Sequence, residues 1–188
     1  MTATVFIAAT IFGLMLAEQR VSRRHERALR AAGAIAPPGD VYRAMAVLYP
    51  AAFLAMAIEG VWRTQATTDT VGGPSWMASG LLLFIASKAL KYWAMASLGP
   101  RWSFRVIVQP GLPLVTQGPY RYLSHPNYVA VVGELVSTAM MMGAIVSGPV
   151  MTAAFGAVLW ARIRFEDRVL AATAPAAASA PQTSQQKG

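Results

Sequence analysis

The sequence predicts an all-α integral membrane protein with about five transmembrane helices, the last two of which form a helical hairpin beside a cytosolic cofactor site. Three observations lead to this fold class. Of the 188 residues, 55% are hydrophobic and only 13% are charged, whereas soluble domains carry about 25% charged residues. The apolar residues fall into five segments, and lysine and arginine gather on one side of them. Lipid is therefore the predicted solvent of most of the chain.

The five apolar segments cover residues 4–17, 44–62, 76–98, 128–147 and 149–160. A transmembrane span needs roughly 20 apolar residues, so the second, third and fourth segments are long enough and the first is short. The uncharged break Ser147-Gly148 predicts a tight hairpin of the last two segments. We expect residues 1–170 to form one membrane domain. Residues 171–188, rich in Ala, Pro, Ser and Gln, are typical of a disordered tail.

The net charge of +8 is explained by topology. In the five-segment arrangement, all but Arg63 of the 16 lysines and arginines lie on the same side. Basic residues mark the cytoplasmic side of a membrane protein, which predicts a cell-membrane protein with its N-terminus outside and its C-terminus in the cytoplasm. Because the same positions suit lipid headgroups, we do not expect nucleic-acid binding. The arginine-rich residues 20–30 are predicted to continue the first helix along the membrane surface, up to Gly33 and the turn at 37–39.

Several polar residues interrupt the apolar segments. Glu134 lies about two turns into the fourth segment, and a carboxylate there is either a hydrogen-bonded helix contact or part of a site. Lys88 and Lys91 lie near the cytoplasmic end of the third segment, where snorkelling to the membrane surface explains both. The chain has no cysteine and its two histidines are far apart in the sequence, so a zinc site is not expected.

The clearest candidate site combines two stretches. Taken alone, His125-Pro126 is typical of a helix start, and Arg162 with Glu166 is typical of a surface salt bridge. Taken together, the polar stretch GPYRYLSHPNY (118–128) and the Arg162/Glu166 face lie at the two cytoplasmic ends of the predicted hairpin. Such a cluster favours an enzyme that binds a polar cofactor from the cytosol and a lipophilic substrate from the membrane. No glycine-rich phosphate loop indicates which cofactor.

These stretches resemble the isoprenylcysteine carboxyl methyltransferase family. The family pattern is a G-x-Y turn, then H-P-x-Y opening a membrane helix, then R-x-x-x-E-[ED] where the next helix leaves the membrane. Here the three motifs are Gly118–Tyr120, His125–Tyr128 and Arg162–Asp167, and the upstream stretch 98–117 is also similar to the family's approach to its site. One departure is Ser124, because the family usually has arginine before His-Pro; Arg121 is the nearest replacement.

The resemblance implies S-adenosylmethionine as methyl donor and no metal. It implies a catalytic role for Arg162, facing the acceptor. The positions that it implies for donor binding are Gln109, Leu112, Pro113, Leu114, Val115, Tyr120, His125, Pro126, Asn127, Tyr128 and Glu166. The N–H groups at the start of the fourth segment are expected to suit the carboxylate of the donor.

Residues 18–60 resemble, less specifically, a bacterial branch of the family linked to polyketide alkylpyrones and alkylresorcinols, through the arginine-rich stretch, the turn at Gly33–Ile35 and Tyr42. This likeness implies an O-methyltransferase for a lipophilic acceptor, with a type III polyketide synthase as its source. Isoprenylcysteine-type carboxyl methylation is the first alternative, so the acceptor oxygen is an enol, a phenol or a carboxylate. An NADPH-dependent sterol-type reductase, which shares the H-P-N-Y turn, and a non-enzymatic membrane protein remain as further alternatives.

Overall fold

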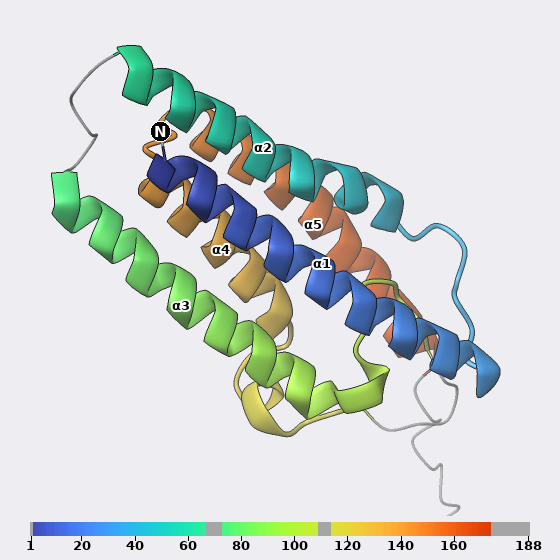
Figure 1. Ribbon diagram of the computed structural model, residues 1–188. Coiled ribbons are helices and arrows are strands. Elements are labelled where there is room, and N and C mark those ends of the chain that lie inside the picture. Colours follow the sequence, from blue (N-terminus) through green and yellow to red (C-terminus); the bar gives the residue numbers. More distant parts are fainter. Residues whose placement is uncertain (1, 67–72, 109–113, 174–188) are drawn as a thin grey trace, which may run out of the picture.

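The computed structural model describes residues 2–66, 73–108 and 114–173, and this part of the chain is helical without strands (Figure 1). The prediction of an all-α fold is confirmed. The elements are α1 (Thr2–Ala31), α2 (Tyr42–Ala66), α3 (Gly73–Leu98), the 3₁₀ turns η1 (Gly99–Arg101) and η2 (Gly118–Arg121), α4 (Pro126–Met142) and α5 (Ser147–Thr173).

The helices form one bundle in which α4 contacts α2, α3 and α5, while α1 lies against α2 (Figure 1). The core is apolar and includes Phe53, Met56, Leu135 and Phe155, each at most 1% exposed. The tightest helix pair is α3 with α4. At Gly133 a Cβ atom would collide with the side chain of Ser87, so a residue without a side chain is needed for this approach.

Within residues 2–66, 73–108 and 114–173, three helices are long and apolar enough to cross a membrane: α1, α2 and α3 continued through η1 to Arg101. The expectation of about five spans is therefore confirmed only in part. Helix α4 has 17 residues, which corresponds to about 26 Å and is marginal for a hydrocarbon core of about 30 Å. Helix α5 is longer, but its second half carries the charged residues of the Arg162–Asp167 motif.

The turn between α4 and α5 differs from the prediction. We expected the apolar segment to continue to Ser147 and to break at Ser147-Gly148, but α4 ends at Met142 and Gly143 terminates it in the left-handed conformation (φ 64°). Pro149 lies in the first turn of α5, where its missing N–H costs nothing. The carboxylate of Glu59 accepts hydrogen bonds from the N–H groups of Val146 (3.1 Å) and Ser147 (2.6 Å) and so ties this turn to α2.

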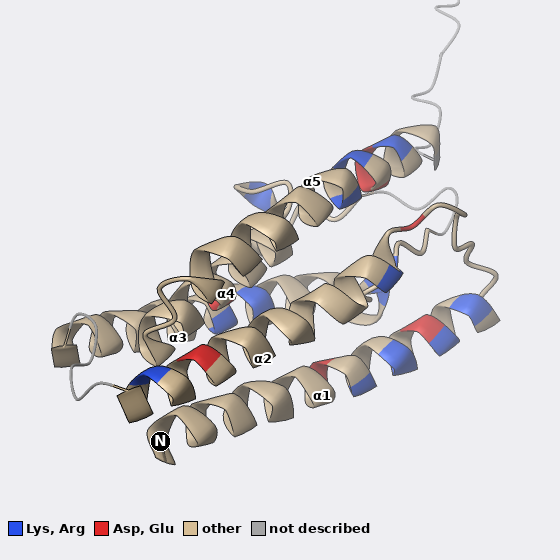
Figure 2. Cartoon of the chain, turned by 90° about the horizontal axis from the view of Figure 1, so that it is seen from above, with Lys and Arg blue, Asp and Glu red and all other residues tan. Residues whose placement is uncertain are grey.

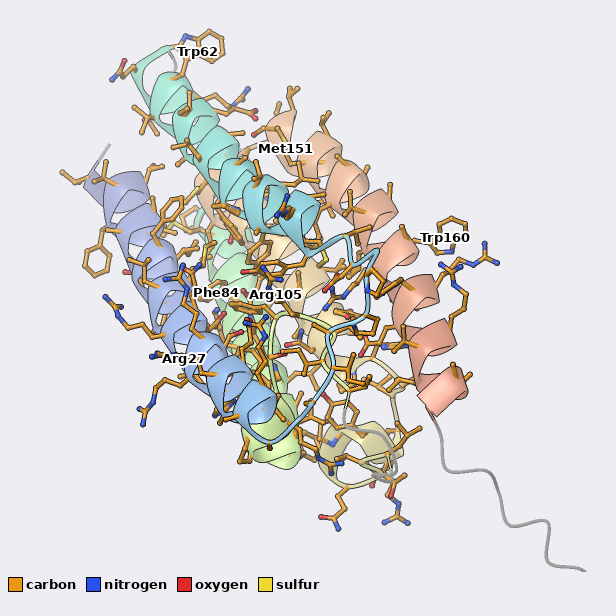
Figure 3. The ribbon with its side chains drawn as sticks, turned by 90° about the vertical axis from the view of Figure 1, so that its right-hand side faces the viewer. Arg27, Trp62, Phe84, Arg105, Met151 and Trp160 are labelled. Carbon is orange, nitrogen blue, oxygen red and sulfur yellow. The ribbon has the colours of Figure 1, made fainter. Side chains whose placement is uncertain are left out.

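Helix α1 continues without a break through the arginine-rich stretch, as predicted, and Gly33 (φ 80°) follows its end. Basic residues colour the C-terminal half of α1 and the C-terminal part of α5 (Figure 2). Arg27 points outward from α1 and Trp160 points outward from α5 (Figure 3). The opposite side of α1 buries Ser22, Glu26 and Leu29, so this half of the helix is amphipathic.

The segment 102–108 crosses the same end of the bundle and is held by the N-terminal part of the chain. The N–H of Phe104 donates to Ser22 of α1 (2.9 Å), and the N–H of Val106 donates to Asp40 (3.1 Å). Val108 forms an isolated antiparallel bridge with Ile35. These contacts bring the loop before α2 and the loop after α3 to one place. At the other end of the sequence, α5 runs to Thr173, so residues 171–173 of the predicted tail are helical and the rest of the tail lies outside the described residues.

Candidate active site

A cavity of about 840 Å³ opens at the end of the bundle where these loops meet. One side of it is polar and is formed by η2, the start of α4 and the C-terminal half of α5. The other side extends between α1 and α2 and is largely apolar; Phe12, Met15, Leu16, Met45 and Ala46 line it. The cavity therefore joins a polar region at the loops to an apolar region between α1 and α2, two helices long and apolar enough to span a membrane.

The residues singled out from the sequence gather at this cavity. Its wall includes Arg162 and the predicted donor-binding positions Leu114, Val115, Tyr120, His125, Asn127, Tyr128 and Glu166. Pro126 is buried as the first residue of α4, next to the cavity wall. The remaining predicted positions, Gln109, Leu112 and Pro113, lie outside the described residues.

Tyr128 is the centre of the polar side. Its hydroxyl donates a hydrogen bond to Glu166 and accepts one from Nε of Arg162 at 3.2 Å. The surface salt bridge between Arg162 and Glu166 that their spacing suggested does not form. Among the described residues, Arg162 forms its ion pair with Asp40 instead, and it is only 3% exposed. The phenol thus separates the guanidinium from Glu166 although the two residues are neighbours on α5.

His125 extends this arrangement toward the solvent. Its ring stacks on that of Tyr128, with centroids 5.3 Å apart and an interplanar angle of 19°. Its Nε2 lies 3.0 Å from Oδ1 of Asp167. The H-P-x-Y motif and the R-x-x-x-E-[ED] motif are therefore joined by two contacts, Tyr128 with Glu166 and His125 with Asp167.

The start of α4 offers fewer N–H groups than expected. The N–H groups of Tyr128 and Val129 both donate to the carbonyl of His125, at 3.1 and 3.3 Å, and Pro126 has no N–H. Only the N–H of Asn127 remains outside this turn. The side chain of Asn127 is a better recognition group, because its Oδ1 is buried without a hydrogen-bond partner in the described part of the chain. A buried acceptor of this kind normally has a partner, so it suits a ligand that donates a hydrogen bond.

Tyr120 reaches the cavity from η2. Gly118, at the start of η2, has a positive φ of 61°, and a Cβ there would collide with the side chain of Ser97; the G-x-Y turn therefore needs glycine. Burial raises the pKa of the Tyr120 phenol above its ordinary value, and the nearby Glu166 adds to this shift. Tyr120 thus stays uncharged and offers an aromatic face and a hydroxyl.

The departure at Ser124 is not compensated by Arg121. Ser124 lines the cavity, whereas Arg121 is absent from its wall and lies over the ring of Tyr122, 5.9 Å from the ring centroid. The position that usually carries arginine in the family therefore presents a hydroxyl here.

Two further groups at the site, Asp40 and the carbonyl of Phe104, were not predicted from the sequence. Arg162 donates to Asp40 through one terminal nitrogen and to the Phe104 carbonyl (2.8 Å) through the other. Asp40 also accepts a hydrogen bond from the N–H of Tyr42 (2.9 Å). Aspartate often accepts the N–H of the residue two positions on and so favours a turn, which was the one sign in the sequence. Nothing near Asp40 in the sequence indicates its pairing with Arg162.

A buried cluster of charged side chains forms a second wall of the cavity. Lys88 and Lys91 belong to it, so they do not snorkel to the membrane surface as expected. Nζ of Lys88 lies 2.7 Å from Glu18 and 3.1 Å from Glu134, and Nζ of Lys91 lies 2.6 Å from Glu18 and 3.2 Å from Glu134. The Tyr49 hydroxyl donates to Glu134 at 2.5 Å. Two lysines and two glutamates neutralise each other between α1, α3 and α4, and Glu18, Lys91 and Tyr49 reach the cavity. Glu134 is therefore an ion-paired helix contact, and Glu18 was missed because the sequence shows it only as the end of an apolar run.

Fold and site together define a helical membrane protein whose bundle encloses a pocket that is polar at the loops and apolar between α1 and α2. The family model described as "Isoprenylcysteine carboxyl methyltransferase (ICMT) family" matches residues 80–172, the region that holds the three motifs. The resemblance predicted from the motifs is confirmed. This match supports a membrane methyltransferase.

The chain is also similar to the uncharacterized protein YpbQ of Bacillus subtilis (strain 168). The two are 29% identical over 154 residues, which covers 82% of this chain and 88% of YpbQ. No solved structure matches the chain significantly. The family match begins within α3 and leaves α1 and α2 outside, so the apolar side of the cavity belongs to the part that the match does not cover.

Proposed function

We propose that this protein transfers a methyl group from S-adenosylmethionine to an oxygen of a lipophilic acceptor. The observation that carries the proposal is that the motif residues of a methyltransferase family surround one cavity, which continues between two membrane-spanning helices. A polar donor from the cytosol and an acceptor from the bilayer would meet where the two sides of the cavity join. The donor supplies an electrophilic methyl group bound to a sulfonium.

The residues on the polar side fit this donor. The donor carries an ammonium group, ribose hydroxyls and a sulfonium. Glu166 and the unpartnered Oδ1 of Asn127 would accept hydrogen bonds from the first two groups. The faces of Tyr120 and Tyr128 suit the positive charge of the sulfonium. The resemblance adds Gln109, Leu112, Pro113, Leu114 and Val115 to the donor site.

Arg162 is suited to the acceptor. Its guanidinium is held by Tyr128, Asp40 and the Phe104 carbonyl, and these contacts use only part of its five N–H donors. A remaining donor can hydrogen-bond the acceptor oxygen and orient it toward the methyl carbon. The apolar lining between α1 and α2 excludes water around the acceptor chain. With both substrates held in line, proximity supplies much of the rate enhancement. The O–CH3 bond would form as the S–CH3 bond breaks, S-adenosylhomocysteine would leave as the thioether, and an acidic acceptor hydroxyl would lose its proton to water at the cytosolic side without a strong base.

We favour long-chain alkylpyrones or alkylresorcinols as acceptors, because residues 18–60 resemble the branch of the family linked to them. A type III polyketide synthase would then supply the substrate. Carboxyl methylation of an isoprenylcysteine-type acceptor is the alternative consistent with the family. The reductase reading of the H-P-N-Y turn is disfavoured by the same family match.

We also propose that the protein is a multi-pass cell-membrane protein with its N-terminus outside and its cavity facing the cytoplasm. The support is the distribution of basic residues, which leaves Arg63 alone on the opposite side. Donor made in the cytosol would then reach the polar side of the cavity directly.

The proposal is tested with purified protein in nanodiscs and S-adenosylmethionine labelled in its methyl group. An alkylpyrone, an alkylresorcinol and a farnesylcysteine derivative are compared as acceptors. We expect label in a methyl ether of one of the first two; label mainly in a methyl ester would favour the alternative. Thermal unfolding with S-adenosylmethionine and with NADPH provides the control. Stabilisation by NADPH alone, or no binding of the methyl donor, would refute the proposed function.

A further inference from the structure

Backbone N–H groups hold the carboxylate of Asp40 in place independently of Arg162. It lies in the loop between α1 and α2, and its two oxygens accept hydrogen bonds from two separate backbone segments. Oδ1 accepts from the N–H of Tyr42 (2.9 Å) and Oδ2 accepts from the N–H of Val106 (3.1 Å). The side chain is 14% exposed. Asp40 is therefore a rigid anion that faces α5 from the part of the chain outside the family match.

Arg162 is bound through all three of its nitrogens. Nε donates to the Tyr128 hydroxyl, and the two terminal nitrogens donate to Asp40 and to the Phe104 carbonyl. Asp40 is the carboxylate with which it forms an ion pair in the described part of the chain. A guanidinium that is 3% exposed needs such a partner, because a buried charge without one is strongly unfavourable.

Glu166 is the other carboxylate within reach. Residues four apart on a helix are neighbours, and arginine with glutamate at this spacing normally pair. Here Glu166 instead accepts a hydrogen bond from Tyr128, and its side chain lines the cavity. The charge of Arg162 is satisfied elsewhere, so Glu166 keeps acceptor capacity for a ligand.

We propose that Asp40 is a positioning residue: it holds Arg162 away from Glu166 and thereby keeps Glu166 available to the methyl donor. This inference rests on the proposed function. It assigns to the N-terminal part of the chain a role in donor binding, although that part contributes no predicted donor contact. Without the negative charge of Asp40, Arg162 is expected to pair with Glu166. Glu166 would then no longer be free to bind the methyl donor.

The test measures binding of radiolabelled S-adenosylmethionine to the detergent-solubilised full chain. We expect Asp40→Asn to weaken donor binding about tenfold. Adding Arg162→Met to Asp40→Asn should restore most of the affinity, because no cation then competes for Glu166. Glu59→Gln is the matched control: Glu59 also accepts backbone N–H groups of another segment, but at the far end of the bundle, and its loss should leave donor affinity unchanged.

A second measurement does not need the donor. Thermal unfolding of Asp40→Asn, Glu166→Gln and the double variant should show a larger loss for the pair than the sum of the single losses, because the double variant leaves Arg162 without a carboxylate. Additive losses, or no rescue by Arg162→Met while the wild-type chain binds the donor, would overturn the role of Asp40 alone. A wild-type chain that binds no donor would overturn the proposed function and this role with it.

Discussion

Tyr128 and Arg162 meet at the polar side of the cavity, where Nε of Arg162 donates a hydrogen bond to the Tyr128 hydroxyl across 3.2 Å. The same hydroxyl donates to Glu166. One phenol on α4 therefore connects the residue proposed to face the acceptor with the residue proposed to hold the donor.

Replacing Glu166 and replacing Arg162 should impair different steps, donor binding in the first case and turnover in the second. We predict that Glu166→Ala weakens or abolishes donor binding, by about tenfold to a hundredfold if one charge-assisted hydrogen bond is lost. Arg162→Ala should mainly lower kcat, with a smaller effect on donor affinity. Equilibrium binding and initial rates with labelled donor measure the two effects. Full activity in both variants would contradict the assignment of the site.

Tyr128→Phe removes the hydroxyl but keeps the ring. We predict weaker donor binding and slower turnover together, because Glu166 and Arg162 both lose their shared partner. The loss of stability should be about 1–3 kcal/mol, since a buried bonding partner is removed. Tyr122→Phe is the control, because Tyr122 is 73% exposed. An effect limited to stability, with unchanged binding and turnover, would show that the hydroxyl is only structural.

The apolar side of the cavity should admit the acceptor. Ala46 of α2 lines it, whereas the adjacent Val47 is 70% exposed and does not. We predict that Ala46→Trp raises the KM of long-chain acceptors and leaves donor affinity unchanged, because the indole fills the space between α1 and α2. Val47→Trp should have no such effect. Equal kinetics of both variants would place the acceptor elsewhere.

The stability of the protein should depend on the balance of charge in the buried cluster of Glu18, Lys88, Lys91 and Glu134. Removing one partner of a buried pair costs about 3–5 kcal/mol, whereas replacing both partners can be neutral. We therefore predict a large fall in Tm for Lys91→Met and a smaller fall for Lys91→Met combined with Glu18→Gln. Thermal unfolding in detergent measures this. A double variant as unstable as the sum of its single variants would mean that the charges do not compensate each other.

The orientation can be tested with single cysteines, because the chain has none of its own. Arg24 and Ala66 are both exposed, near opposite ends of the bundle. We predict that a membrane-impermeant thiol reagent labels Ala66→Cys in intact cells and labels Arg24→Cys only after lysis. The reverse pattern would invert the proposed topology.

Much of the fold could be predicted from local patterns. The length of each apolar run and the glycines and prolines between runs predicted five helices near their observed places. The error at the α4–α5 turn arose because apolar residues continue past Gly143, so composition alone did not mark the end of α4. The motifs on α4 and α5 were also expected to lie near each other, since a hairpin brings its two open ends together, and His125, Tyr128, Arg162 and Glu166 do line one cavity.

The partners of the charged residues could not be predicted in the same way. Asp40 lies 122 residues from Arg162, and Glu18 lies 70 residues from Lys88. Each of these four residues has a plausible local explanation, such as a helix cap, a membrane-surface residue or a snorkelling lysine. These local explanations fail because the side chains are buried, and a buried charge needs an oppositely charged partner.

Apolar run lengths and motif order are properties of the chain alone, so they were enough to predict an all-helical membrane protein and the family match of residues 80–172. The packing of the helices, by contrast, pairs Arg162 with Asp40 rather than with Glu166 and turns Lys88 and Lys91 inward to two glutamates. The physical reason is desolvation. A buried charge must find an opposite charge, and which one it finds depends on how the helices pack.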